Sequence, residues 1–184
     1  MLNGVQTVFI SYAPDIAVPG VPQAVAEFTA QAAAQGVARV VLLSGRGEPE
    51  AEAAERLVQD GPLPWTIVRC SWFAQNFSES FLLDPVLGGE VALPVDGVTE
   101  PFVDCDDIAE VATEALLDDR HAGQLYELTL SPDEVSLVSY LFATVLDGRN
   151  SSLTNGVERA LGRPPRDFAG YARETAKTGI WSSR

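Results

Sequence analysis

The sequence predicts an α/β fold in which a parallel sheet of about four core strands is flanked by helices and followed by a helical C-terminal part. Three short apolar runs rich in β-branched residues are typical of strands: Gln6–Tyr12 (QTVFISY), Val37–Ser44 (VARVVLLS) and Pro64–Cys70 (PWTIVRC). The middle run is apolar almost throughout, which is typical of a strand covered on both faces. Helical segments separate the three runs, and strands joined by such crossovers lie parallel.

Two helices are predicted between these strands. The first, Val21–Gln35, carries an apolar stripe at helical spacing, and Gly36 follows at the position of a helix C-cap. The second, Glu48–Asp60, has acidic residues in its first turn, where the helix dipole favours negative charge. Both helices therefore fit as crossovers between neighbouring strands.

After the third strand the pattern becomes less regular. A short helix is predicted over Phe73–Leu83, and small strands or loops over Glu90–Pro101. Asp104–Leu117 is a clear amphipathic helix. Gln124–Thr129 (QLYELT) is the fourth predicted strand of the parallel sheet.

The rest of the chain predicts three helices. Ser131–Glu134 (SPDE) is typical of a capping box with proline at the first helical position, and the helix that follows it extends to Leu146. Two shorter helices are predicted near Thr154–Leu161 and Pro165–Ala176. No repeat or linker divides the chain, so we expect one domain. Its predicted parts are a sheet half, residues 1–129, and a helical region, residues 130–184.

The charge balance excludes several classes of partner. The chain has 26 acidic and 12 basic residues and a net charge of −14. Such a field repels nucleic-acid phosphates, and the basic residues form no stripe, so we expect no nucleic-acid binding. No apolar run approaches the roughly 20 residues that span a bilayer, and the N-terminus lacks the pattern of a secretory signal. We therefore expect a cytoplasmic protein without membrane contact.

The sequence predicts neither a disulfide nor a metal site. Cys70 and Cys105 lie in apolar, strand-like segments, and disulfides are rare in cytosolic proteins. Two cysteines and one histidine do not supply the four ligands of a structural zinc site. Asp104, Asp106 and Asp107 suggest a cation site, but N-capping of the following helix explains one or two of them without a metal.

Five stretches carry a family resemblance through their order and spacing. They are Val40–Gly47 (VVLLSGRG), Trp65–Phe77 (WTIVRCSWFAQNF), Pro101–Ala112 (PFVDCDDIAEVA), Tyr126–Thr129 (YELT) and Leu161–Phe168 (LGRPPRDF). Together they resemble the NmrA-like branch of the atypical short-chain dehydrogenases, in the NAD(P)-binding Rossmann superfamily. The resemblance covers nearly the whole chain, from Leu2 to Trp181, and implies a Rossmann-like sheet.

Two departures from that family affect the predicted cofactor. The chain begins at what resembles the family's fourth strand, so the dinucleotide-binding βαβ half, on the order of 70 residues, is expected to be absent. Its 15 glycines form no G-x-G-x-x-G or G-x-x-G-x-x-G pattern. The chain is also shortened after Thr129. A Tyr-x-x-x-Lys pair is impossible, because the only lysine is Lys177 and position 173 is arginine. We therefore expect no cofactor, with NADPH or NADH as the alternative.

The resemblance implies a substrate pocket directly after the third strand. Its candidate residues are Arg69, Cys70, Ser71, Trp72, Phe73 and Asn76. Asn76 would polarise a carbonyl, and the two aromatic residues would form an apolar wall. A reactive thiol at Cys70 needs a depressed pKa and a neighbouring base, so a buried, small apolar role is favoured for it.

Three further candidates lie at strand ends or on a crossover helix. Ser44 and Tyr12 end neighbouring strands at the carboxyl edge of the sheet, where ligands bind in such folds. A polar strand end and an edge aromatic are the alternatives for these two. Glu55 is a candidate general acid or base on the second helix. A solvated position is favoured for it, because acidic residues crowd the same helix.

These features support three hypotheses. The first is a small-molecule-binding descendant of the family that lacks the dinucleotide site and acts on an apolar metabolite in a non-redox step, such as cyclisation or isomerisation. The second is an NAD(P)H-dependent quinone or carbonyl oxidoreductase whose nucleotide site is completed by another chain. The third is a non-catalytic regulatory or partner module. In each case the apolar edge strand at residues 6–12 predicts a homodimer or heteromer that covers it.

Overall fold

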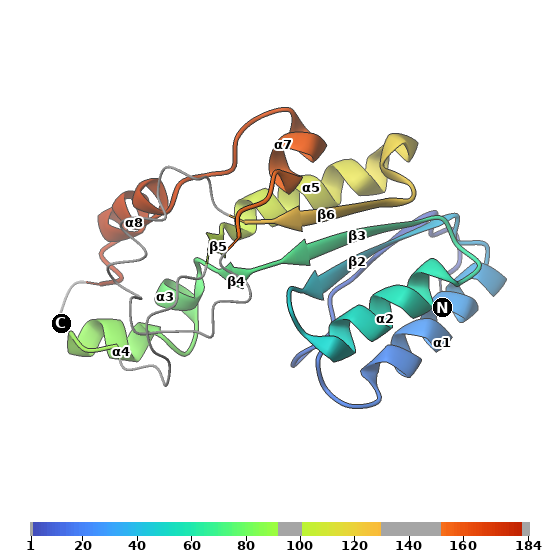
Figure 1. The fold of residues 1–184 in the computed structure, drawn as a ribbon, viewed down its shortest axis with the longest axis horizontal. Helices are drawn as coiled ribbons and strands as arrows, with labels where there is room; N and C mark the ends of the chain where they lie inside the picture. The colour runs from blue at the N-terminus through green and yellow to red at the C-terminus, as the bar shows by residue number, and fades with distance from the viewer. Residues whose placement is uncertain (1, 92–100, 130–151, 182–184) are drawn as a thin grey trace.

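A four-stranded parallel sheet forms the centre of the molecule (Figure 1). The structure is a computed structural model and describes residues 2–91, 101–129 and 152–181. The strand order is β1-β2-β3-β6. The strands are β1 (Thr7–Ile10), β2 (Arg39–Gly45), β3 (Trp65–Cys70) and β6 (Gln124–Leu128). The α/β fold with about four parallel strands, predicted from the sequence, is confirmed.

Helices cover both faces of this sheet. Figure 1 shows α1 (Val21–Ala34) and α2 (Pro49–Gln59) on one side, with α5 (Cys105–Leu117) and α7 (Gly156–Leu161) on the other. The side chains of β2 alternate between two buried clusters, because successive residues of a strand point to opposite faces. Val40 and Leu42 pack with α1 and α2, whereas Val41 packs with α5 and α7. This double coverage explains the nearly continuous apolar run of β2.

A smaller unit follows the carboxyl ends of the strands. It contains β4 (Trp72–Phe73), paired in parallel with β5 (Phe102–Val103), and the helices α3 (Asn76–Glu79), α4 (Leu83–Gly88) and α8 (Phe168–Lys177). An aromatic cluster holds these elements together. Its buried members are Phe77, Phe102 and Phe168, and its half-buried members are Trp72, Tyr171 and Trp181.

The single helix predicted over Phe73–Leu83 is wrong. Phe73 belongs to β4, and the Ala74 backbone N–H donates to the Val103 carbonyl, which draws this stretch toward β5. Ser80 then adopts an extended backbone and ends α3 before α4 begins. Phe77 of α3 and Leu82, the N-cap residue of α4, are both buried in the aromatic cluster, so burial of these residues outweighs helical continuity.

The other predicted elements agree with the structure to within about three residues, a common uncertainty at element ends. The two short C-terminal helices appear as α7 and α8. The segment Glu90–Pro101 lies mostly outside the described residues, and the helix predicted from Ser131 to Leu146 lies wholly outside them. No helix within the described ranges combines the length and the apolar character needed to cross a membrane.

The sheet is less completely covered at its β1 edge than at its centre. Within the described ranges, β1 is hydrogen-bonded to β2 on one side and to no strand on the other. Phe9 pairs in register with Val41, so it lies on the face that α5 and α7 cover, yet it remains 39% exposed. These helices therefore protect β2 and β3 more completely than β1.

Candidate functional site at the carboxyl edge of the sheet

Three polar residues form a row across the carboxyl ends of the strands. Ser44 of β2 pairs in register with Arg69 of β3, which in turn pairs with Glu127 of β6. Side chains at one register level of a parallel sheet point to the same face. The fold therefore brings a hydroxyl, a guanidinium and a carboxylate side by side at the edge where ligands bind in open α/β sheets.

Glu55 joins this row from α2. Its Oε1 accepts a hydrogen bond from Ser44 Oγ at 2.6 Å and another from Arg69 Nε at 2.9 Å. Its Oε2 accepts a short hydrogen bond from Arg69 Nη2. Glu55 is only 2% exposed, so the solvated position favoured from the sequence is wrong. The hydrogen bonds to Glu55 raise the pKa of the Arg69 guanidinium above its ordinary value, which keeps this group charged.

Two residues that the sequence analysis missed extend the row into a network. Glu127 Oε2 accepts from Arg69 Nη1 at 3.2 Å, and Glu127 Oε1 pairs with Arg46 Nε at 2.9 Å. Arg46 Nη2 also donates to Ser152 Oγ at 2.6 Å. We call Ser44, Arg46, Glu55, Arg69 and Glu127 the carboxyl-edge network. Two arginines balance the charge of two glutamates in this network, and each of its charged groups is hydrogen-bonded or ion-paired.

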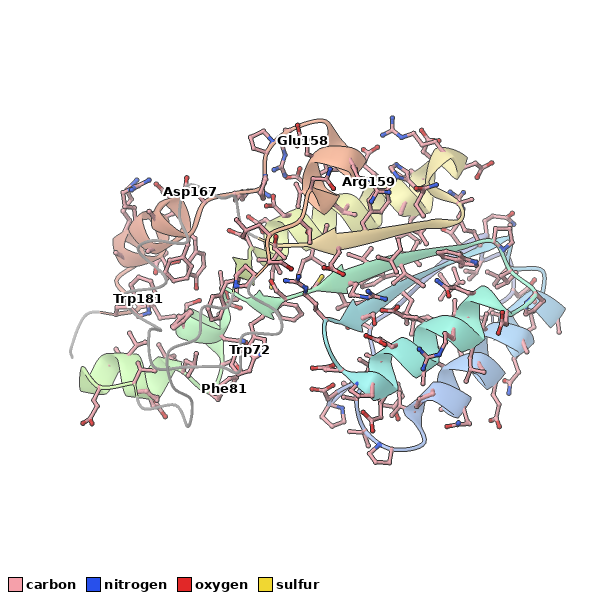
Figure 2. The ribbon with its side chains drawn as sticks, viewed as in Figure 1. Trp72, Phe81, Glu158, Arg159, Asp167 and Trp181 are labelled. Atoms are coloured by element: carbon pink, nitrogen blue, oxygen red, sulfur yellow. The ribbon has the colours of Figure 1, made fainter. Side chains whose placement is uncertain are left out.

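Two of the predicted pocket residues, Ser71 and Trp72, follow directly after the end of β3. Ser71 is 4% exposed, and its hydroxyl has no hydrogen-bond partner in the described part of the chain. The next residue, Trp72, makes edge-on ring contacts with Phe81 at 6.0 Å and with Phe102 at 6.4 Å. Phe81, which the sequence analysis did not select, is 59% exposed. Figure 2 shows Trp72 and Phe81 close together below β4.

The other predicted candidates are placed differently. Phe73 packs against the cluster beneath α5, and Asn76 begins α3 as a half-buried residue. Tyr12 follows β1 and is 39% exposed, outside the hydrogen bonds of the carboxyl-edge network. Cys70 lies in the core on the α5 face, where burial raises the pKa of its thiol well above the usual value. This placement favours the packing role of Cys70, because a thiolate is disfavoured there.

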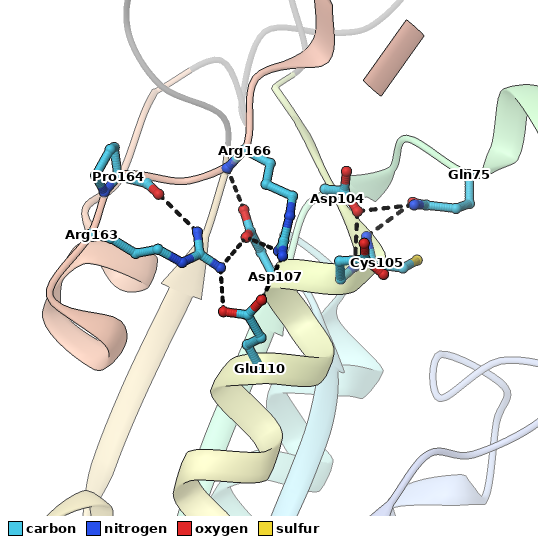
Figure 3. Close-up of polar contacts among 9 residues, drawn as sticks. Gln75, Asp104, Cys105, Asp107, Glu110, Arg163, Pro164 and Arg166 are labelled. Carbon is cyan, nitrogen blue, oxygen red and sulfur yellow. Dashed lines mark hydrogen bonds and ion pairs between the residues drawn. The ribbon is translucent and has the colours of Figure 1, made fainter. Parts of the chain in front are cut away.

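A second group of ion pairs holds the C-terminal segment against α5 (Figure 3). Asp107 accepts hydrogen bonds from Arg163 Nη2 at 2.7 Å and from both Nη1 and the backbone N–H of Arg166 at 2.6 Å. Glu110, one turn later, binds the same two arginines. We call these four residues the tail clamp. It fixes the segment that leads to Phe168, the residue through which α8 enters the aromatic cluster.

The acidic run before α5 therefore has two structural roles. Asp104 is the N-cap, because its Oδ1 accepts from the Asp106 backbone N–H at 2.8 Å. Gln75 donates to the same oxygen and accepts from the Cys105 backbone N–H, which ties the segment before α3 to the start of α5 (Figure 3). Asp107 binds Arg163 and Arg166 of the tail clamp. N-capping was predicted from the sequence, whereas the tail clamp was not.

Several solved structures share the fold of this chain. No family model matches the chain. The nucleoside-diphosphate-sugar epimerase of Staphylococcus aureus has a TM-score of 0.71 and 14% identity, over 92% of this chain and 77% of that one. The triphenylmethane reductase of Citrobacter sp., complexed with NADP(H), has a TM-score of 0.68 and 13% identity, over 96% and 77%. These similarities extend over most of the chain and show a shared Rossmann-like fold.

A curated relative is also similar in sequence. Prestalk A differentiation protein A of Dictyostelium discoideum is 24% identical over 161 residues, which cover 66% of this chain and 54% of the relative. The chain therefore spans about half the length of that relative. The similarity shows that this protein is a distant homologue of the chain.

Proposed function

We propose that this chain is an NmrA-like derivative of the short-chain dehydrogenases that binds a small, mostly apolar molecule at the carboxyl edge of its sheet. The observation that carries the proposal is the buried Ser71 hydroxyl, which lacks a partner among the described residues and precedes the aromatic wall of Trp72 and Phe81. A buried hydroxyl without a partner costs about 1–3 kcal/mol. A ligand that offers an acceptor to Ser71 and an apolar surface to the wall would recover that cost.

The carboxyl-edge network supports a binding role more directly than acid–base catalysis. Both oxygens of Glu55 and both of Glu127 already accept hydrogen bonds or pair with arginine. These carboxylates therefore orient Ser44 and Arg69, and they are poor acceptors for a substrate proton. The non-redox step that we propose, of cyclisation or isomerisation type, would instead use donors such as Ser71 and Asn76 to polarise a ligand carbonyl.

Two other candidate functions keep specific support. A fold shared with a reductase complexed with NADP(H) favours an NAD(P)H-dependent oxidoreductase whose nucleotide site is completed by another chain. The relative called a differentiation protein favours a regulatory module. The cytoplasmic location expected from the sequence stays a prediction in all three cases.

A matched pair of ligands tests the proposed binding site. We expect 2-acetylnaphthalene, an uncharged aromatic ketone, to bind about three- to tenfold tighter than 2-ethylnaphthalene, which has a similar size and no acceptor. The variant Ser71→Ala should bring this ratio close to one, and Ser78→Ala, at a buried serine on α3 that already has partners, should leave it unchanged. Calorimetry provides the affinities. Equal binding of both ligands to the unaltered protein would contradict the role of Ser71.

Titration with NADPH and NADH separates the first two candidate functions. We expect no binding up to millimolar nucleotide, because no glycine pattern in the chain permits close approach of the backbone to a pyrophosphate. Micromolar binding, measured by calorimetry or nicotinamide fluorescence, would refute the redox-silent proposal and favour the oxidoreductase.

We also propose that a protein partner, in the simplest case a second copy of this chain, covers the open edge of β1. Light scattering at micromolar concentration should then give twice the mass of one chain. The variant Phe9→Lys should shift the protein to monomer, because it places a charge on this edge. Phe28→Lys is the matched control, since Phe28 is exposed to a similar extent, 38%, and belongs to α1 instead of the edge strand. A monodisperse monomer of the unaltered protein would contradict the prediction.

A further inference from the structure

A cavity of about 490 Å³ lies at the opposite end of the sheet from the carboxyl-edge network. It is lined by Arg120 and His121 of η1 (Asp119–His121), by Gln124 and Tyr126 of β6, and by residues 159–162 at the end of α7 and its C-cap. Figure 2 shows Arg159 on the part of α7 that lies near the beginning of β6. Neither the proposed function nor the comparisons assign a role to this cavity.

A chain of hydrogen bonds fixes the direction of the protons in the cavity wall. Arg120 Nε donates to His121 Nε2 at 3.0 Å, so Nε2 is an acceptor and the neutral imidazole carries its hydrogen on Nδ1. His121 Nδ1 lies 2.9 Å from Tyr126 Oη and must therefore donate to it. Burial, followed by the charge of Arg120, lowers the pKa of His121, which agrees with a neutral ring.

The hydroxyl hydrogen of Tyr126 is consequently left to donate elsewhere. Its oxygen already accepts from His121, and no acceptor for its hydrogen is present within residues 2–91, 101–129 and 152–181. Tyr126 as a whole is only 5% exposed. A buried tyrosine hydroxyl usually finds a hydrogen-bond partner, so the cavity offers an unsatisfied donor.

The guanidinium of Arg159 adds a positive charge to the cavity wall. It lies 5.2 Å from the centre of the Tyr126 ring and donates to the Leu125 carbonyl at 3.3 Å and to Gln124 Oε1 at 3.2 Å. It forms no ion pair with any acidic residue of the described ranges. In contrast, Arg163 and Arg166 of the tail clamp each bind two carboxylates.

We propose that this cavity binds a small oxyanion, a carboxylate or phosphate group whose oxygens accept hydrogen bonds from Tyr126 Oη and Arg159. A guanidinium fork matches the geometry of both groups, and a tyrosine hydroxyl supplies the neutral donor beside it. The protein carries a net charge of −14, so its overall field repels anions. Affinity at this cavity must therefore come from the local arrangement of donors.

The test is a titration of the purified chain with inorganic phosphate and, separately, with acetate, followed by amide and side-chain NMR shifts. We expect saturable shifts at residues 120–126 and 159–162 and binding in the millimolar range. Arg159→Gln should weaken binding about tenfold or more, since it removes a charged donor. Tyr126→Phe, which keeps the ring, should weaken binding about three- to tenfold.

Arg173→Gln is the matched control, because Arg173 is an exposed arginine on α8 whose carboxylate partner is 3.7 Å away. This variant should bind as the unaltered protein does. Tighter binding of phosphate identifies a phosphate monoester as the natural ligand class, and tighter binding of acetate identifies a carboxylic acid. Shifts that do not saturate by 100 mM, or equal affinity of Arg159→Gln and the unaltered protein, would overturn the proposal. The result does not depend on the ligand site at the carboxyl edge.

Discussion

Replacing Asp107 with alanine is expected to lower the free energy of unfolding by about 3 kcal/mol. The Asp107 side chain is completely buried and is the shared partner of Arg163, Arg166 and the Arg166 backbone N–H. Its removal leaves two guanidinium groups without their central carboxylate. Both arginines are about a third exposed and regain some hydration, so the loss falls at the lower end of the range for a broken buried pair.

Glu110→Gln is the matched control for this prediction. Glu110 binds the same two arginines from the same helix, but its side chain is 45% exposed. Its replacement should cost less than about 1 kcal/mol, as for surface ion pairs. Urea unfolding gives both values, and near-UV circular dichroism of Asp107→Ala should show a loosened aromatic cluster. Equal losses in the two variants would mean that apolar contacts of Phe168, and not the buried carboxylate, hold α8.

The second large effect is expected for Glu55→Ala, which should cost about 4 kcal/mol. The substitution removes both Glu55 oxygens that bind Arg69, and with them the oxygen that accepts from the buried Ser44 hydroxyl. It also leaves a cavity beneath α2. Arg69 would retain Glu127 as its remaining carboxylate partner. Thermal and urea unfolding measure the loss.

Two further variants locate the origin of that loss. Glu52→Ala, on the same helix, removes an exposed carboxylate 3.7 Å from Arg56 and should cost about 0.5 kcal/mol or less. The double variant Glu55→Leu with Arg69→Met replaces the ion pair with apolar side chains and should recover most of the stability. If the double variant unfolds as easily as Glu55→Ala, the network stabilises the fold through more than this pair of charges.

The sheet could be predicted from the sequence because its signal is local. Buried parallel strands are apolar runs, and each run between Gln6 and Thr129 became a strand. The region after Trp72 was harder, because its elements form through contacts with β5 and α8 that lie far away in the sequence. Short helices of this kind depend on tertiary packing more than on their own periodicity.

The candidate site was predicted only in part. Ser44 and Arg69 could be selected as candidates because they lie at strand ends. Their shared contact with Glu55 could not be predicted, because it depends on the register of β2 against β3. One signal was present: Glu55 lies on the same helical face as Ala51, Ala54 and Val58, all of which are buried. The crowding of acidic residues on the helix masked that periodicity. Arg46 and Glu127 meet only because β6 pairs with β3, which no local pattern indicates.

The pairing of the strands also sets the order in which the sheet can assemble while the chain is being synthesised. Thr7 and Arg39, which pair, are 32 positions apart, whereas Thr66 and its partner Gln124 are 58 positions apart. Ribosomes add about 5–20 residues per second, so β3 waits roughly 3–12 s for its second neighbour. During that interval the α1–α2 face can close, but the opposite face, with Val41 and Val68, has no cover from α5 or α7. A chaperone that binds apolar surface on nascent chains would find its target there.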